Sequence, residues 1–438
     1  MQSTPAGPIA PLPPENESGR SIPAATSRQV EPDSHLLSSA ERLGLGSLGR
    51  LVPIFDPALQ WSESGQTGAV AGKILTVTSV GGTLDVEQNW NHYRLRVVYR
   101  GADAIYRPSD LGISSLPYQV GNISQELLLG RWTLRLRDDA SYSSGGGFGG
   151  LFLGGPAQAG IGTLNSIQPT LVSAATIQTG LARQVYNTAV GEIDYSRSRR
   201  TTLTLVASAN LVHFLDRGYI NSEDFNGRIG YNYALSAKNN IGLTYGRDRT
   251  SFFGSASRME TDLLQLAFGR KITGRLAFQV EAGPQLFHFV NYGLAKTRQL
   301  SWSAFSALTY QRGHAGYSLS YFRGVSPGSG VLFGSNSEFI TGTANREITR
   351  FWSASMNGGY ASSKALAPSA MFSSQFNNWF AGANLNRQIG AQVYLGLSYG
   401  FQQQSIGGGS CPVLSCGLPG SFSQLGVNLQ WHPLARGR

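Results

Sequence analysis

The sequence predicts an all-β fold, a transmembrane antiparallel up-and-down β-barrel of about 18 strands, and three observations support this prediction. Only 14% of the 438 residues are charged, whereas a soluble domain carries roughly 25% charged residues. Apolar and polar residues alternate along most of the chain. No run approaches the ~20 consecutive apolar residues that a membrane helix needs, so a helical membrane protein is excluded.

The clearest alternation lies in the last predicted strand, residues 421–432. Its apolar side chains fall on one face and its small or amide side chains on the other, namely Leu425, Val427, Leu429 and Trp431 against Gln424, Gly426, Asn428 and Gln430. The segments IGLTYG, RIGYNYALS, RLAFQVEAG and AQVYLGLSYGF repeat the pattern. These strands run for roughly 10 to 15 residues, which suits a tilted crossing of a bilayer better than a soluble sheet.

Short connections set the strand count. They are expected at 90–92, 129–131, 196–198, 236–239, 272–274, 312–314, 347–349 and 388–390. These turns join sixteen strands and residues 421–432 add a seventeenth. An even number is expected in a single-chain bacterial barrel, so residues 52–63 are the candidate for one more strand. Pro53 and Pro57 make that segment a poor strand, and 16 strands is the alternative.

Aromatic residues cluster beside these short turns, where amphipathic rings would lie at the level of the lipid headgroups. The residues are Trp90, Tyr93, Trp132, Tyr233, Tyr310, Phe351, Trp352 and Trp431. Longer Gly- and Ser-rich connections lie between the short ones, and residues 145–182 form the longest. We expect that loop to be mobile or to fold into the barrel. Short turns on the periplasmic side and long loops outside are typical of an outer-membrane barrel.

The chain divides into three parts. Residues 1–50 are rich in Pro and Ser and predict a disordered periplasmic tail. Residues 51–433 predict the barrel, and residues 434–438 a short basic tail. The first residues show no signal peptide, so the true N-terminus stays open. Cys411 and Cys416 predict a loop disulfide, with two unpaired thiols as the alternative, because a zinc site needs four ligands.

Charged side chains in the first strands predict a pore lining. If Tyr93, Leu95, Val97 and Tyr99 face lipid, the intervening residues face inward. The predicted pore-lining residues are Asp85, Glu87, Arg94, Arg96, Arg100, Arg135, Arg137 and Asp139. One interpretation pairs opposite charges across neighbouring strands. The other is a transverse field of arginines facing carboxylates across a constriction, which would favour anionic solutes.

Other chemistries have little support. The GGGFGG segment lacks the strand-to-helix context and the Gly-Lys-Ser/Thr sequence of a phosphate loop. His213 and His288 lie near outer strand ends, where an embedded hydrolase would hold its site, but no Ser or Asp partner is indicated by spacing. We therefore expect no enzyme, cofactor or metal. Dispersed Lys and Arg also argue against nucleic acid.

Four segments resemble one family: FNGRIGYNYALSAKNNIGLTYGRDRTSFFG, GRKITGRLAFQVEAGPQL, SLSYFRGVSPGSGVLFG and SFSQLGVNLQWHP. Together with the Cys pair they are similar to outer-membrane β-barrel proteins of the acidobacterial type. The resemblance covers roughly residues 75–438 and implies fold and location, not chemistry. One departure is that Trp431 is followed by HPLARGR, whereas most outer-membrane barrels end on an aromatic residue.

The sequence thus predicts a bacterial outer-membrane protein, a porin-like diffusion channel for small polar or anionic solutes. A non-conducting structural, adhesive or export-accessory barrel is the alternative, and an embedded enzyme a distant third. The expected partners are outer-membrane lipids and the barrel-insertion machinery. The solute and the oligomeric state are not specified.

Overall fold

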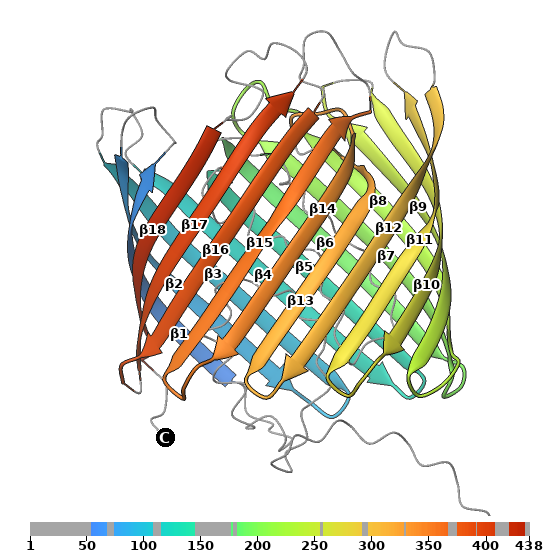
Figure 1. Cartoon of the computed structure of the whole chain (residues 1–438), viewed down its shortest axis with the longest axis horizontal. Helices are drawn as coiled ribbons and strands as arrows, with labels where there is room; N and C mark the ends of the chain where they lie inside the picture. The colour runs from blue at the N-terminus through green and yellow to red at the C-terminus, as the bar shows by residue number, and fades with distance from the viewer. Residues whose placement is uncertain are drawn as a thin grey trace, which may run out of the picture.

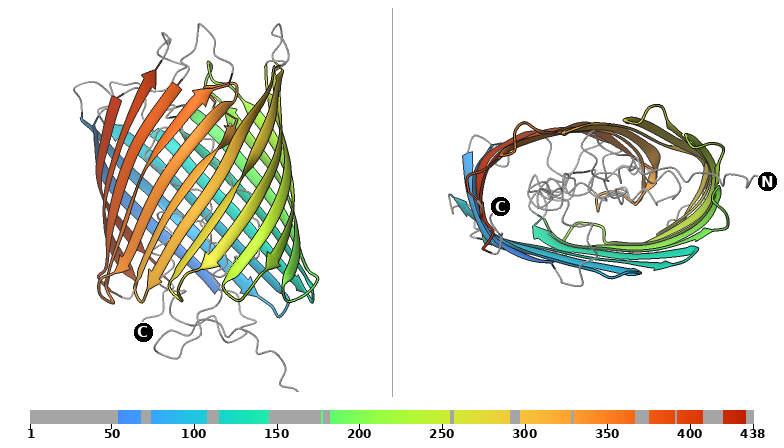
Figure 2. Two further views of the ribbon diagram at one scale, coloured as in Figure 1. Left: turned by 45° about the vertical axis from the view of Figure 1, so that its right-hand side comes forward. Right: turned by 90° about the horizontal axis from the view of Figure 1, so that it is seen from below.

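The computed structural model describes residues 54–67, 74–107, 115–144, 177, 182–254, 257–290, 297–327, 330–366, 375–390, 392–407 and 420–433. Its strands form a single 18-stranded antiparallel sheet in which each strand pairs with its neighbours in sequence. The first strand also pairs with the last, which closes the barrel. Figure 1 shows the strands running obliquely around the wall, and Figure 2 shows an elongated cross-section.

The strands have similar lengths around the barrel. They are β1 (Ile54–Thr67), β2 (Ile74–Asn89), β3 (Tyr93–Arg107), β4 (Ser115–Leu129), β5 (Trp132–Ser144), β6 (Arg183–Ser196), β7 (Thr201–Phe214), β8 (Ser222–Ala234), β9 (Asn239–Phe252), β10 (Arg258–Lys271), β11 (Leu276–Val290), β12 (Thr297–Arg312), β13 (Ala315–Ser326), β14 (Ser335–Glu347), β15 (Trp352–Ala365), β16 (Gln375–Gln388), β17 (Val393–Gly407) and β18 (Gly420–Trp431).

The predicted fold and the count of 18 strands are confirmed, and the 16-strand alternative is wrong. The first strand lies at Ile54–Thr67 instead of 52–63. It contains Pro57 because that residue lies beyond the end of β18, where pairing with β1 stops at Leu59 and Trp431. On its other side Pro57 faces Leu84 of β2. Proline is tolerated where one edge of a strand has no partner.

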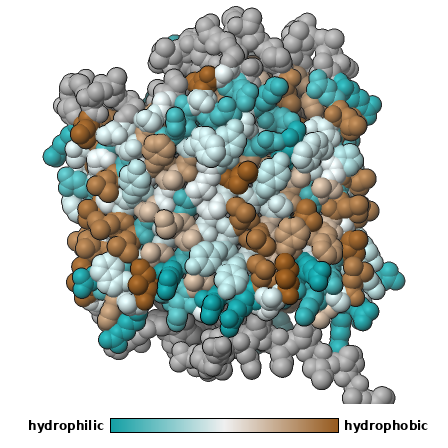
Figure 3. Space-filling view, in the orientation of Figure 1, coloured by the Kyte–Doolittle hydropathy of each residue, from teal (hydrophilic) through white to brown (hydrophobic). Residues whose placement is uncertain are grey.

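The predicted alternation becomes the two faces of the wall. On β18, Leu425 is 64% exposed and Trp431 is 43% exposed, whereas Gln430 on the other face is 5% exposed. Large apolar side chains face outward on every part of the circumference. Figure 3 shows them as a brown and pale band across the barrel, with hydrophilic side chains above and below. The outside of the barrel therefore carries an apolar belt.

All eight predicted short connections join consecutive strands at one end of the barrel, where β1 also begins and β18 ends. The β4–β5 turn is tight because Gly130 adopts a φ of 61°, which disfavours residues with a side chain. We call this end the short-turn end and the opposite end the long-loop end. A first strand that begins and a last strand that ends at the same end as the short turns are typical of a bacterial barrel.

Several predictions fall outside the described residues and stay predictions. They are the tails at 1–50 and 434–438, the disulfide between Cys411 and Cys416, and nearly all of the loop at 145–182, of which only Ile177 is described. Among the described residues, no helix has the length and apolar character to cross a membrane.

Candidate functional site

The inner faces of β2 to β6 form what we call the charged wall. The register brings all eight predicted pore-lining residues to this face, because Glu87 lies opposite Arg96, Arg94 opposite Glu126, and Arg135 opposite Glu192. Their outward neighbours Tyr99 and Leu136 are 46% and 57% exposed. The structure therefore places these eight residues on the inward face, as the alternation predicts. That they line a pore stays a prediction.

Ion pairs join the arginines to carboxylates of the same wall. Arg96 holds Asp85 of β2 through two hydrogen bonds, from Nε to Oδ1 at 3.1 Å and from Nη2 to Oδ2 at 2.5 Å. On β5, Arg137 Nη2 lies 2.6 Å from Asp139 Oδ2. Asn122 of β4 donates its side-chain amide to the same aspartate. Two-pronged contacts of this kind fix both the position and the orientation of a guanidinium.

Arg135 is the centre of a network that crosses β3 to β7. Its Nε donates to Glu126 at 3.1 Å, and its Nη1 donates to Glu192 at 2.5 Å and to Asp194 at 2.7 Å. Glu126 also accepts from Arg94 at 3.1 Å, and Asp194 accepts from the Thr204 hydroxyl at 2.5 Å. One guanidinium therefore compensates three carboxylates, two of which are buried.

Glu126, Glu192 and Asp194 were not among the predicted site residues. Their parity is visible in the sequence, since Glu192 and Asp194 are two residues apart and alternate with Ile193. Their partner is not visible, because β6 reaches β5 only after the long connection at 145–182. The sequence therefore indicates the inward face of each strand but not the contacts between them.

The inner faces of β12 to β18 form the opposite, uncharged wall. Apart from Glu347 at the last position of β14, no Asp, Glu, Lys or Arg of the described residues takes an inward position there. Hydroxyl and amide groups occur instead. Ser326, Ser335, Ser337 and Ser363 form a chain of hydrogen bonds 2.8 to 3.2 Å long. Apart from Glu347, the described part of this wall thus presents no carboxylate or arginine to the charged wall, as the second interpretation, a field across a constriction, would require of these strands.

Phenylalanines interrupt the polar lining of the uncharged wall. Phe305, Phe322 and Phe339 lie opposite one another on β12, β13 and β14, and Phe380 of β16 stacks on Phe339 with centroids 5.9 Å apart. Gly359 makes room for this stack, since a Cβ there would lie 2.3 Å from a backbone oxygen and 2.6 Å from the Phe380 ring. The result is an aromatic strip halfway along an otherwise hydrophilic surface.

A second group of inward charges lies on β8 to β11. Asp224 accepts from Thr250 at 2.7 Å and from Asn210 at 3.2 Å, and Glu281 accepts from Gln279 at 2.6 Å. Asp248 also faces inward and accepts from Asn226. Over β2 to β11, inward carboxylates outnumber inward arginines. The lumen wall that the structure describes is therefore not a basic surface.

Residues 330–334, between β13 and β14, reach across the lumen at the long-loop end. The Gly330 carbonyl accepts a hydrogen bond of 2.8 Å from Ile220, and a Cβ on Gly330 would lie 2.1 Å from the Phe214 ring of β7. Val331 and Leu332 pack in one buried cluster with Ile177 and with Phe376 of β16. Since β7 and β16 lie nine strands apart in a ring of 18, this segment joins opposite walls.

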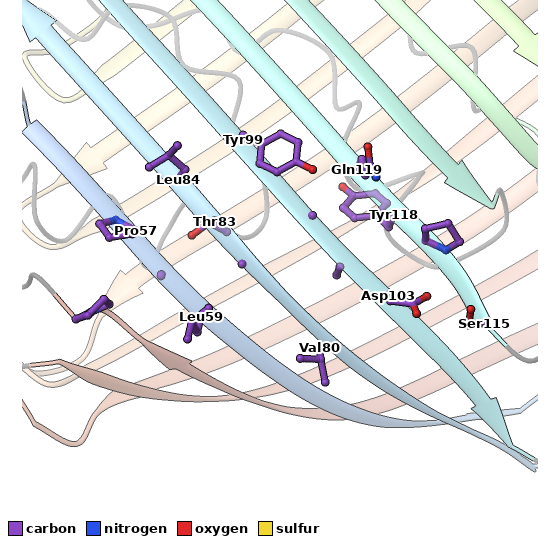
Figure 4. A pocket seen from close by; sticks show the side chains of 16 residues that line it. Pro57, Leu59, Val80, Thr83, Leu84, Tyr99, Asp103, Ser115, Tyr118 and Gln119 are labelled. Carbon is purple, nitrogen blue, oxygen red and sulfur yellow. The ribbon is translucent and has the colours of Figure 1, made fainter.

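A hollow of about 830 Å³ lies over β1 to β4 (Figure 4). The exposed side chains of Leu59, Val80 and Tyr99 border it, and these face outward by register. It exists because Gly82 and Gly101 present no side chain between them. The hollow therefore belongs to the apolar outer face and not to the lumen.

The two histidines considered for catalysis do not face the lumen. His213 lies opposite Val185, and His288 lies between Glu260 and Arg298, all at outward positions. Among the described residues, no hydrogen bond or ion pair joins either ring to a serine or an aspartate. The described inner surface offers hydrogen bonds and fixed charges to a solute.

Comparison with known proteins gives structural neighbours alone. No family model matches the chain, and no curated protein matches it. Among solved structures it is similar to Pseudomonas aeruginosa OpdK with vanillate, at 10% identity, a TM-score of 0.42, and coverage of 87% of this chain and 98% of that one. It is similar to OccK2 (OpdF) of the same organism, in complex with glucuronate, at 10% identity, a TM-score of 0.43, and coverage of 87% of this chain and 98% of that one. It is also similar to Pseudomonas aeruginosa OccK11 (OpdR), at 13% identity, a TM-score of 0.40, and coverage of 87% of this chain and 95% of that one.

Proposed function

We propose that the chain is a porin-like diffusion channel of the bacterial outer membrane for small polar or anionic solutes. The observation that carries the proposal is the closed 18-stranded wall, apolar outside and lined inside by ion pairs, hydroxyls and amides. Closure pairs every strand with a neighbour on each side, which is the condition for a sheet to lie in hydrocarbon. A wide barrel whose inner residues are polar holds water.

The distribution of aromatic residues supports a membrane location. Trp132 and Trp431 are exposed at the short-turn end, and Trp302 and Trp379 are exposed nearer the long-loop end. Tryptophan and tyrosine occupy both interfaces of a membrane barrel, with aliphatic side chains between them. The lipids and the insertion machinery expected from the sequence belong to the same proposal and follow from the membrane location, whereas the family of acidobacterial type rests on the resemblance alone.

Polar solutes fit the described lumen better than strongly anionic ones. Four of the inward arginines that would attract anions form ion pairs on their own wall, namely Arg94, Arg96, Arg135 and Arg137. Apart from Glu347, the described part of the uncharged wall presents neutral donors and acceptors. Such a surface exchanges hydrogen bonds with a solute at little cost in desolvation.

Conductance across a planar bilayer tests the proposal. Purified folded protein should give discrete ohmic steps, and its reversal potential in a KCl gradient reports the charge preference. A folded preparation that inserts and stays silent would contradict the channel. Insertion is checked independently by protease protection in the same vesicles.

A non-conducting barrel is the second candidate, and residues 330–334 favour it. This segment and Ile177 fill part of the lumen with buried apolar side chains. Replacing Val331 and Leu332 by serine removes that packing. A wild-type protein that is silent and a double variant that conducts would identify a closed barrel; equal step conductance in both would show that the segment leaves the pathway open.

A further inference from the structure

Positive charge outside the lumen concentrates at the short-turn end. From the β4–β5 turn onward, every short connection carries an arginine or lysine at the turn or within two residues of it. Among the described residues of these connections and their flanks, Glu347 is the carboxylate found beside the basic side chains. His314 Nδ1 lies 2.8 Å from its Oε2. In the described part of the chain, the excess of positive charge therefore lies at the short-turn end and not in the lumen.

Four of these arginines repeat at one position. Arg270, Arg312, Arg346 and Arg387 stand at or next to the end of β10, β12, β14 and β16, each exposed and each at an outward position by register. Because they occur on alternate strands, they follow the circumference at intervals of roughly 10 Å. We call these four residues the arginine collar. No ion pair among the described residues joins any of them to a carboxylate.

The collar lies at the level of the aromatic side chains that border the apolar belt. The Arg387 guanidinium lies 5.1 Å from the ring centroid of Trp352, and Arg350 lies 4.5 Å from that of Phe351. Tyr317, opposite Tyr310 on β12, is 45% exposed on the same border. Rings of this kind mark the headgroup region of a bilayer. The guanidinium groups are thus placed beside lipid phosphates and directed sideways, away from the barrel axis.

We infer that the arginine collar binds the headgroups of anionic phospholipids in the leaflet next to the short-turn end. Guanidinium donates two parallel hydrogen bonds to a phosphate, and an excess of basic side chains at a membrane surface selects lipids with net negative charge. A soluble acidic partner would approach the short-turn end along the barrel axis, whereas these side chains face outward from the wall, toward the lipid. The inference rests on the proposed membrane location and is independent of conduction.

The opposite end of the barrel supplies a matched control. Arg247, Arg249, Arg258 and Arg298 also face outward there, on β9, β10 and β12. Two of them are compensated, since Arg247 and Arg258 each lie 3.2 Å from Glu260. Replacing these four arginines by glutamine removes the same formal charge as replacing the collar, but at the other surface.

Native mass spectrometry of the full chain tests the inference. Protein is exchanged into equimolar phosphatidylglycerol and phosphatidylcholine, and the retained lipids of each kind are counted. The wild type should retain phosphatidylglycerol preferentially. The collar variant, with all four arginines changed to glutamine, should lose at least fivefold in this preference, because a single charge at an anionic surface already contributes roughly fivefold. The control variant and a collar variant with four lysines should keep most of it.

The inference would be overturned by no lipid preference in the wild type, by an equal loss in the collar and control variants, or by displacement of the lipid by excess inorganic phosphate. Binding of the wild type to peptidoglycan without a lipid preference would also overturn it and assign the collar to that polymer. β-sheet circular dichroism confirms that each variant is folded. A silent barrel that keeps its lipid preference would contradict the channel and leave this inference standing.

Discussion

The charged wall on β2 to β6 and the uncharged wall on β12 to β18 enclose one lumen but are stabilised in different ways. The charged wall is held by a network in which Arg135 compensates carboxylates from three positions. The uncharged wall is held by serine hydroxyls and by the stack of Phe339 on Phe380. The comparison shows that a hydrophilic lining does not require charge, and that the arginines of the charged wall meet carboxylates of the same wall instead of carboxylates across the pore.

The largest expected effect is on the charged wall. Arg135→Ala leaves the buried Glu192 and Asp194 without a cation and Glu126 with Arg94 alone, and we expect a loss of roughly 3–5 kcal/mol in the free energy of unfolding, as for other broken buried pairs. Urea unfolding in lipid vesicles, followed by tryptophan fluorescence, measures it. Adding Glu192→Gln should restore part of the loss. A double variant as unstable as the single one would show that the carboxylates are not what destabilises it.

A smaller loss is expected on the uncharged wall. Phe380→Ala removes a ring that is 5% exposed and packs with Phe322, Phe339 and Ala361. We expect about 3 kcal/mol, near the low end for such a truncation, because lumen water can enter the space. The same unfolding assay applies, with Phe380→Leu as the conservative control. If Phe380→Ala cost nothing, the aromatic strip would not stabilise this wall.

Charge selectivity should separate the two walls without unfolding either one. Replacing Arg94, Arg96 and Arg137 by glutamine leaves Asp85 and Asp139 without their cations, so the reversal potential in a KCl gradient should shift severalfold toward cation permeation. Replacing Gln402 and Gln404 of β17 by alanine should leave it unchanged. A shift of equal size in both variants would mean that pore width, and not the charged wall, sets selectivity.

Much of this architecture could be predicted from the sequence. Period-two alternation gives strands and faces, so the inward position of Arg94 and the outward position of Leu425 follow from parity alone. The short turns give the strand number because each one is local. Pro57 obscured the first strand, since its tolerance depends on where β18 ends.

The site could be predicted only in part. Inward charges were visible, but the register between β5 and β6 is set across a long connection, and it decides that Arg135 meets Glu192. The crossing of residues 330–334 was not predicted, because a Gly-rich segment such as GSGVLFGS is typical of an ordinary loop. Its place in the lumen depends on Phe214 and Phe376, which are far away in sequence.

The smallest expected effect concerns an exposed ion pair at the long-loop end, between Arg183 at the start of β6 and Asp216. Asp216, in the β7–β8 connection, accepts from the Arg183 backbone at 2.6 Å and from its guanidinium at 2.7 Å. These bonds from Arg183 lower the pKa of Asp216. Because the folded-state pKa is lowered, the stabilisation from these bonds is fully present above the usual aspartate pKa of about 4. It is lost as the pH falls through the lowered pKa, where Asp216 becomes protonated.

Because both partners are substantially exposed, Asp216→Asn should leave the unfolding midpoint at pH 7 unchanged while hydrogen exchange of the Arg183 amide becomes severalfold faster. In the wild type the same acceleration should appear only at acidic pH. The unfolding midpoint of Asp216→Asn could instead drop as far as that of Arg135→Ala. Burial would then not be what distinguishes the two ion pairs, and the difference would lie in the number of carboxylates that each arginine contacts.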